Sequence, residues 1–362
     1  MIGFTLGRYF FLRYVTITAW FFVGVFALVF LVDFTQFQDV VSGSSSYSFT
    51  GALAVSALRV PMVMQQTVPF IGLFSAMFTL ISLNRKYELV IARSAGISAW
   101  QFLTPVAIGA FVFGLFTIIL LNPLAAYGFS QSQGIETSLR AGDNKRSTAF
   151  EEPWLRQSYE GVDTIIGARS VMNDGLELHG ASFFRFDADG DFSDRLDAER
   201  AFLREGYWEL QGIESFADGR RIVSTESVHI PTGLTPELVA QRVARPETVP
   251  FFELPGKISV ARTFGLRADA FAMQFHSLVA LPLLLVAMTL IAATVSMRFA
   301  RMGQSELMIL GGILAGFLLY VVSVLVKAFG SAGIVPPVIA AWVPVVVAMF
   351  FGVTFLLHRE DG

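Results

Sequence analysis

The segment RKYELVIARSAGISAWQ, residues 85–101, is a short charged stretch between two long apolar runs. Residues 86–95 are good helix formers. One face of this stretch carries residues at helical spacing: Tyr87, Val90, Ile91, Ser94 and Ala95. Gly96 suits the left-handed residue that ends a helix, and Ser98 begins a capping-box pattern with Gln101. We therefore predict a complete small helix, followed directly by the start of the next one.

Outward from this segment, the composition is that of a membrane protein. The chain of 362 residues is 54% hydrophobic and 15% charged, and it contains 36 phenylalanines. Of its 55 charged residues, 39 fall between residues 126 and 272. Six apolar runs outside that window are long enough to cross a hydrocarbon core of roughly 30 Å as helices. They lie near residues 14–35, 58–83, 102–124, 274–297, 306–328 and 336–357.

These runs predict an α + β membrane protein of three spans, a polar domain and three more spans. We place the N-terminal membrane half at 1–125, with the small helix at 85–98 inside it, the polar domain at 126–272 and the C-terminal membrane half at 273–362. The first run follows Arg8 and Arg13, but it is longer than the apolar region of a secretory signal and lacks a cleavage pattern, so we expect a retained span.

The orientation follows from basic residues in the short loops. With the N-terminus inside, eight of them face the cytoplasm: Arg8, Arg13, Arg85, Lys86, Arg93, Arg298, Arg301 and Arg359. The opposite short loops offer only Arg59 and Lys327, both at the ends of spans. We therefore expect both termini in the cytoplasm and the polar domain on the opposite side of the membrane.

The polar domain has the pattern of an antiparallel β domain. Candidate strands are DTIIGARSV (163–171), LELHGASFFRF (176–186), RAFLREGYWEL (200–210) and RRIVSTESVHI (220–230). Turn signals separate them at Asn173-Asp174-Gly175, Asp189-Gly190 and Asp218-Gly219. This spacing predicts a sandwich or a jelly-roll-like domain. Further on, Thr235 is placed to cap a short helix with Pro236 at its first position.

Several kinds of chemistry are missing from the sequence. Asp187-Ala188-Asp189-Gly190-Asp191 has the acidic density of a calcium loop, but its glycine stands fourth and no helix pattern flanks it, so we favour a hairpin tip. The four histidines are scattered and the chain has no cysteine, so we expect no metal and no cofactor in this chain. Neither a phosphate-binding loop nor a nucleophile motif is present, and the net charge of −3 argues against nucleic acid. We expect no catalytic residues.

The small helix at 85–98 allows two interpretations. Its basic residues can simply face anionic lipid. A short helix in water is only marginally stable, however, so a helix-favouring sequence indicates that something packs on it. We favour a docking helix for a cytoplasmic partner that presents Arg85, Glu88 and Arg93 to the cytoplasm.

The pattern Glu88-Leu89-x-x-x-Arg93-x-x-Gly96-Ile97-Ser98 resembles the coupling segment of LptF and LptG, the permease family that exports lipopolysaccharide. The likeness continues along nearly the whole chain, through Arg8-Tyr9, Val60-Pro61, Asn122-Pro123, Leu234-Thr235-Pro236 and Pro336-Pro337. The Val-Pro, Leu-Thr-Pro and Pro-Pro positions favour the LptG branch.

This resemblance implies a non-catalytic permease subunit that extracts lipopolysaccharide from the inner membrane. It implies a heterodimer with a paralogous permease, a homodimeric LptB-like ATPase that binds ATP and magnesium, and a periplasmic bridge of the LptC or LptA kind. The residues expected to couple to the ATPase are Arg85, Glu88, Arg93, Gly96 and Ser98. ATP binding would close the ATPases, and the 85–98 helix would pass that motion to spans one and five.

Polar and small residues at membrane depth suggest lipid contacts. Asp33 ends the first apolar run, and Arg59 and Lys327 are the cations near the outer ends of spans, so all three are candidates for binding the lipid head group. The alternatives are a wetted helix end or a relay for Asp33 and simple snorkelling for the two cations. Small residues on span five suit either an adjustable gate or ordinary helix–helix contact without a gate: Gly311, Gly312 and Gly316.

Other classes of function remain open at this point. A secondary transporter would show broken helices or paired ionisable residues near the midplane, and these spans carry hardly any. A membrane-anchored assembly or signalling protein with a periplasmic β receptor domain, and a permease for another lipid, are the alternatives that remain.

Overall fold

The computed structural model describes residues 4–41, 49–140, 154–159, 162–172, 176–187, 192–217, 220–224, 227–233, 246–263, 268–296 and 306–360. Within these ranges, six helices are long and apolar enough to cross a membrane. They are Phe4–Gln38, Phe49–Arg85, Ala99–Gln133, Asp269–Ser296, Ile309–Ser331 and Pro337–His358. The predicted order of three spans, a β domain and three spans is confirmed.

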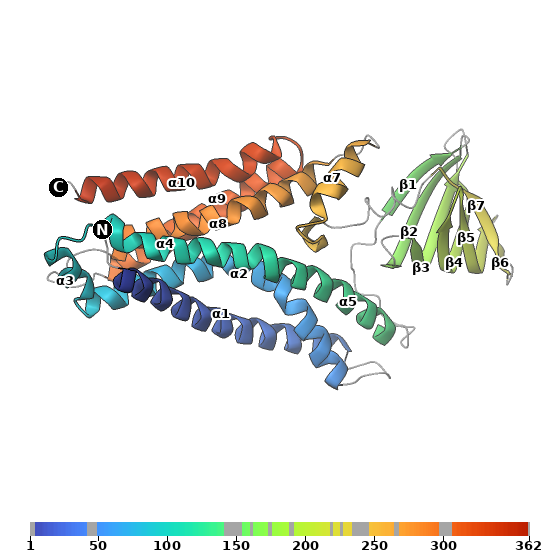
Figure 1. Ribbon diagram of the computed structural model, residues 1–362. Coiled ribbons are helices and arrows are strands. Elements are labelled where there is room, and N and C mark those ends of the chain that lie inside the picture. Colours follow the sequence, from blue (N-terminus) through green and yellow to red (C-terminus); the bar gives the residue numbers. More distant parts are fainter. Residues whose placement is uncertain are drawn as a thin grey trace.

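Six helical elements precede the sheet. These are α1 (Phe4–Val41), α2 (Phe49–Arg85), the short α3 (Glu88–Ser94), α4 (Ala99–Phe116), a π-helical turn η1 (Thr117–Leu121) and α5 (Asn122–Arg140). Helix α3 is the one that lies between two spans. After the sheet come a 3-10 turn η3 (Pro246–Thr248), α7 (Leu254–Thr263), α8 (Asp269–Ser296), α9 (Glu306–Ser331) and α10 (Pro337–Glu360). Elements α4, η1 and α5 follow one another without a break, so the third span continues along α2 to the sheet end of the bundle (Figure 1).

Helices α2 and α8 form the centre of the bundle. In the most apolar window of each, 61% of the residues are buried, against 6% in α1 and 11% in α9. Close contacts occur where a glycine removes a side chain: a Cβ on Gly114 of α4 would lie against the backbone of Pro282 in α8. Small residues at such crossings let helix backbones approach closely in a membrane. Helices α1 and α9 therefore leave most of their apolar surface uncovered by the chain itself.

The inserted domain is one curled antiparallel sheet of seven strands (Figure 1). Its strands are β1 (Trp154–Tyr159), β2 (Val162–Met172), β3 (Glu177–Phe186), β4 (Phe192–Arg204), β5 (Tyr207–Ala217), β6 (Arg220–Ser224) and β7 (Val228–Pro231). Strands β1 to β6 pair in sequence order, and β7 also pairs with β5. One face carries the core, in which Phe183 and Trp208 meet edge to face with ring centroids 6.0 Å apart. The antiparallel character predicted from the turn signals is confirmed.

Two of the predicted strands need correction. The strand predicted over 200–210 is wrong, because the chain turns at Glu205-Gly206 and residue Arg204 pairs with Tyr207. Gly206 has φ +83°, a left-handed value that favours glycine at such a turn. The strand predicted over 220–230 is two short strands, β6 and β7, which pair with different parts of β5.

Some predicted features lie outside the described residues. They are the three Asx-Gly turns, the Leu234-Thr235-Pro236 motif with its predicted helix, the tip of the acidic stretch at 188–191, and Arg298 and Arg301. Among the residues that the structure does describe, no three His, Asp or Glu side chains are grouped so as to hold a metal ion.

A buried amide joins the bundle to the segment that returns from the sheet. Asn122, the first residue of α5, is fully buried. It donates to Gln65 Oε1 on α2 at 2.9 Å and accepts from the backbone N–H of Phe251 at 2.7 Å. Around this contact, Val249, Leu254 and Phe271 share one buried cluster. The return segment is therefore fixed to the bundle by both a hydrogen-bonded amide and apolar packing.

The sheet lies beyond one end of the helical bundle, whereas α3 and both chain ends lie at the other (Figure 1). This arrangement follows from the odd number of spans on either side of the insertion. The segment predicted to couple to the ATPase, residues 85–98, therefore lies at one end of the molecule. The residues predicted to bind the lipid head group, Asp33, Arg59 and Lys327, lie at the other.

Candidate functional site at the junction of α1, α2 and α3

The predicted small helix exists, although it is shorter than the predicted 86–95. Helix α3 spans Glu88–Ser94 and begins after Tyr87, whose left-handed backbone (φ 60°) separates α3 from α2. Gly96 is left-handed as predicted, with φ +82°. The predicted capping box is confirmed: Gln101 N–H donates to Ser98 Oγ at 3.4 Å, and Ser98 N–H donates to Gln101 Oε1 at 3.2 Å. Both ends of α3 are thus defined by local backbone geometry.

Helix α3 is apolar on both sides. Its inner side, with Leu89 and Ala92, is buried; Leu89 joins the main core of the bundle. Its outer side carries the residues predicted to share a face, and Tyr87, Val90 and Ile91 are 59%, 38% and 64% exposed. Apolar side chains gathered on an exposed helix at the end of a bundle are typical of an interaction surface.

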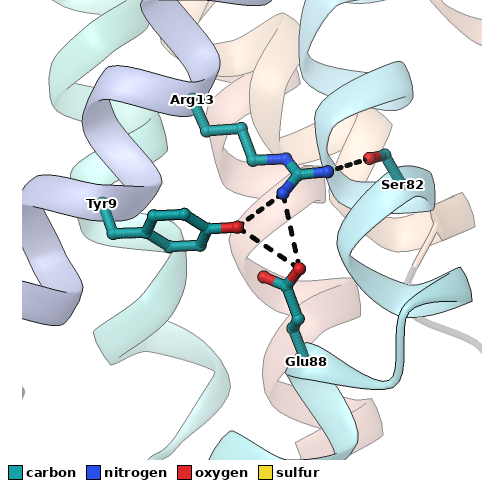
Figure 2. Close-up of polar contacts among 4 residues, drawn as sticks. All are labelled: Tyr9, Arg13, Ser82 and Glu88. Atoms are coloured by element: carbon teal, nitrogen blue, oxygen red, sulfur yellow. Dashed lines mark hydrogen bonds and ion pairs between the residues drawn. The ribbon is translucent and has the colours of Figure 1, made fainter.

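Glu88 connects α3 to the first two spans (Figure 2). Its Oε1 accepts a hydrogen bond from the Tyr9 hydroxyl at 3.3 Å and lies 3.4 Å from Arg13 Nη1. The Arg13 guanidinium also donates to the Tyr9 hydroxyl and to Ser82 Oγ, each at 2.5 Å. Four side chains from α1, α2 and α3 therefore form one polar junction.

This junction is only partly shielded from solvent. The side chains of Arg13 and Glu88 are 18% and 27% exposed. An ion pair with this access to water contributes on the order of 1 kcal/mol or less. The Tyr9 and Ser82 hydroxyls add further modest hydrogen bonds. Several weak contacts hold α3 against α1, and such contacts can be exchanged during a movement.

The three polar side chains predicted to face a cytoplasmic partner have different surroundings. Arg85 at the end of α2 and Arg93 on α3 are exposed. Glu88 instead turns inward, because the first turn of α3 brings its carboxylate to the Arg13 guanidinium of α1. The Glu88 carboxylate is thus part of an intramolecular contact.

At the opposite end of the bundle, the three candidates for head-group binding have partners within the chain. Arg59 Nε lies 3.8 Å from Asp33 Oδ1, and the Arg59 guanidinium sits over the ring of Phe37, 5.8 Å from its centroid. Lys327 Nζ donates to Gln274 Oε1 at 2.8 Å. Each cation therefore links two helices, α1 to α2 and α8 to α9.

The three glycines predicted for span five have different surroundings. A Cβ on Gly312 would meet Val295 of α8, and one on Gly316 would meet Leu73 of α2. A Cβ on Gly311 would meet nothing within 4 Å. Gly312 and Gly316 allow close packing of α9 on the centre of the bundle, whereas Gly311 does not take part in it.

The partners of Glu88 were missed from the sequence. Tyr9 and Arg13 stand four residues apart, which places them on one helix face, and Ser82 is a polar residue at the end of an apolar run. These signals mark a polar stripe on α1 but do not say which loop it meets. The contact between Asn122 and Gln65 was also missed, because the two residues are 57 positions apart.

Comparison with known proteins identifies a family of membrane permeases. The family model for the lipopolysaccharide export system permease LptF/LptG matches residues 8–358. The lipopolysaccharide export system permease protein LptG of Haemophilus influenzae (strain ATCC 51907 / DSM 11121 / KW20 / Rd) is 24% identical over 330 residues, which cover 89% of this chain and 88% of that protein. Permeases of this family are non-catalytic transmembrane subunits without a cofactor, and the LptB partner binds ATP. The chain is a multi-pass membrane protein that belongs to the lipopolysaccharide export system permease LptF/LptG family.

Proposed function

We propose that this permease transmits the work of a separate LptB-like ATPase dimer to lipopolysaccharide through α3. The other members of the complex are a paralogous permease and a periplasmic bridge of the LptC or LptA kind. The relative named LptG supports assigning the chain to the LptG branch. The permease contributes shape and coupling, and ATP hydrolysis takes place in the partner.

The proposed sidedness puts α3 and both chain ends in the cytoplasm and the sheet in the periplasm. The bias of eight basic residues against two supports it. The fold is compatible with it, because α3 and the chain ends share one end of the bundle (Figure 1). An ATPase docked on α3 would then have access to cytoplasmic ATP.

The observation that carries the docking proposal is the exposed outer side of α3. Tyr87 and Ile91 are more than half exposed at a place where the helix is held from behind by Leu89 and Ala92. A partner that covers this side gains the burial of apolar surface, at about 25 cal/mol per Å². Arg85 and Arg93 flank it and supply charges for orientation. Gly96 and Ser98 set where α3 ends and α4 begins.

The proposed route of coupling passes through Glu88 to α1. A displacement of α3 moves the Glu88 carboxylate. Its contacts with Arg13 and Tyr9 transmit this movement to the first span. Helices α1 and α9 leave most of their apolar windows uncovered. These two helices are therefore our candidates for contact with the paralogous permease and with the acyl chains, with Gly312 and Gly316 permitting α9 to shift. Arg59 and Lys327 stay predictions as head-group ligands.

Copurification tests the docking proposal with two matched isoleucines. Ile91 on α3 and Ile334 in the turn between α9 and α10 are 64% and 70% exposed, at opposite ends of the bundle. Ile91→Glu should abolish copurification of the ATPase with the permease, whereas Ile334→Glu should leave it intact. Equal retention of the ATPase by both variants would show that it docks elsewhere.

The sidedness has its own test, because the chain contains no cysteine. Single variants Ile91→Cys and Ile334→Cys each create one thiol in a cysteine-free background. A membrane-impermeant maleimide added to spheroplasts should label position 334 and spare position 91 until the cells are broken. Labelling of position 91 in intact spheroplasts would reverse the proposed orientation.

A further inference from the structure

A groove between α1 and α2 lies directly beside the polar junction. It has a volume of about 420 Å³ and opens on the outer surface of the bundle. Tyr9, Arg13 and Ser82 form its polar end. The rest of the lining is mainly apolar and consists of Leu12, Thr16, Ile17 and Phe78. The groove is wide open, so a molecule bound in it would stay in contact with its surroundings along one side.

The groove lies where the long apolar run of α1 begins. Arg13 stands two residues before Val15, where the long apolar run of α1 begins. On the apolar side, Leu12 and Phe78 are 47% and 55% exposed. These exposed apolar side chains give an acyl chain a surface on which to pack. The groove thus offers a charged group at head-group level and an apolar path that leads from it into the bilayer.

The chemistry at the polar end favours an anion. The Arg13 guanidinium has five N–H donors, and its described contacts with Tyr9, Ser82 and Glu88 engage only part of that capacity. Its contact with Glu88 is long, at 3.4 Å. A phosphate can accept two parallel N–H bonds from a guanidinium. Exposed cations at the same end of the bundle add to the positive field: Arg8, Arg85, Lys86 and Arg93.

We propose that this groove is a binding site for an anionic phospholipid of the surrounding leaflet. Its phosphate binds Arg13, and one acyl chain lies along Leu12, Thr16, Ile17 and Phe78. The lipid phosphate and Glu88 then share the Arg13 guanidinium, so lipid binding changes the Arg13–Glu88 contact that holds α3. Only the identity of the leaflet, the cytoplasmic one, depends on the proposed function.

Photocrosslinking in nanodiscs tests the site with matched leucines. Leu12 in the groove and Leu357 on α10 are 47% and 46% exposed near the same end of the bundle. A photoreactive amino acid replaces one or the other in the full chain, purified with its bound subunits and placed in phosphatidylcholine containing a minor share of phosphatidylglycerol. Captured lipids are identified by mass spectrometry. The ratio of phosphatidylglycerol to phosphatidylcholine should be severalfold higher at position 12 than at position 357.

Three variants test whether capture of the anionic lipid depends on this groove. Arg13→Gln should lower the ratio at position 12 to that at position 357, whereas Arg8→Gln, which changes an exposed arginine on the same helix, should preserve the enrichment. Thr16→Phe fills the groove without changing Arg13, so it should also reduce capture.

Equal ratios at the two positions, or an enrichment that survives both Arg13→Gln and Thr16→Phe, would overturn the proposal. Capture of added lipopolysaccharide in place of phosphatidylglycerol would overturn it as well. None of these outcomes depends on whether the ATPase docks on α3, so the lipid site and the proposed function fail independently.

Discussion

The two ends of the helical bundle are closed by different chemistry. At the end next to the sheet, the return segment is tied down by Asn122, a neutral and fully buried amide with partners on two sides. At the other end, α3 is tied to α1 by Glu88 and Arg13, a charged pair that is partly open to solvent. Breaking the Asn122 junction costs more free energy than breaking the Glu88–Arg13 junction.

This difference indicates which part of the molecule can move. A buried amide that loses its partners leaves them unsatisfied, at about 1–3 kcal/mol for each group. A partly exposed ion pair can exchange its partner for water or for another ion at a small cost. The sheet end is therefore suited to hold its position while the α3 end responds to a partner.

The largest effect is expected from Asn122→Leu. The substitution leaves Gln65 Oε1 and the Phe251 N–H without the partner they have now, so the free energy of unfolding should fall by about 2–6 kcal/mol. Thermal denaturation in detergent would show this as a lowered Tm. Gln66→Leu, an exposed amide on α2, is the control and should change the Tm little. Similar Tm values for the two variants would remove the proposed contrast between the ends.

The next effect concerns the cations at the sheet end. If Arg59 and Lys327 bind lipid phosphates, Arg59→Ala and Lys327→Ala should weaken lipopolysaccharide binding about tenfold or more, since hydrogen bonds to charged groups contribute about 1.5–3 kcal/mol. The measurement is lipopolysaccharide-stimulated ATPase activity in proteoliposomes, compared with basal activity. Asp33→Asn separates the two roles, because it removes the negative charge that lies 3.8 Å from Arg59 and leaves the cation. Equal loss of basal and stimulated activity in all three variants would assign these residues to helix packing.

A smaller effect is expected from Glu88→Gln at the α3 end. The substitution removes the charge and keeps the shape, so it should loosen α3 by on the order of 1 kcal/mol or less. Hydrogen exchange of the amides of residues 88–94 should become faster, and added salt should speed exchange in the wild type more than in the variant. Glu253→Gln, an exposed glutamate near α7, should leave this exchange unchanged. Salt-independent exchange in the wild type would contradict an ionic junction.

The smallest effect belongs to the sheet. The hydrogen bond from Arg204, with a second from Gln211, holds the pKa of Glu209 below its usual value of 4.5. A lowered pKa stabilises the folded state above the usual pKa, and this contribution is lost as the pH falls through the folded value. The sheet should therefore become slightly less stable below about pH 4.5, and Glu209→Gln should remove that part of the pH dependence. Glu205→Gln, in the neighbouring turn, is the control; an identical acid response in both variants would exclude Glu209 as the source.

The elements set by local sequence were predicted correctly. The six spans follow from apolar length. The end of α3 and the start of α4 follow from Gly96 and the Ser98 capping box, which need no distant partner. The family resemblance drawn from scattered motifs is confirmed as well. The alternatives of a secondary transporter and a signalling protein give way to the export permease.

The features that depend on distant contacts were not predicted. Turning Glu88 toward Arg13 requires α1 and α3 to meet, and the segments are 75 residues apart. The strand predicted over 200–210 failed because apolar and aromatic residues continue on both sides of Glu205-Gly206 and hide the turn. Arg59 looked like a solitary cation until the fold placed Asp33 beside it.

The left-handed backbone of Tyr87 limits how this position can change. Among the described residues it is the only one other than glycine with a positive φ, a conformation that costs a residue with a Cβ about 1–2 kcal/mol. Exposed positions usually accept many side chains. Here the backbone favours glycine and disfavours branched residues, while an aromatic ring would serve the proposed docking surface. We therefore expect a narrow range of residues at this position among natural variants. A glycine there would stabilise the isolated permease and, if the ATPase docks on α3 as proposed, weaken its binding.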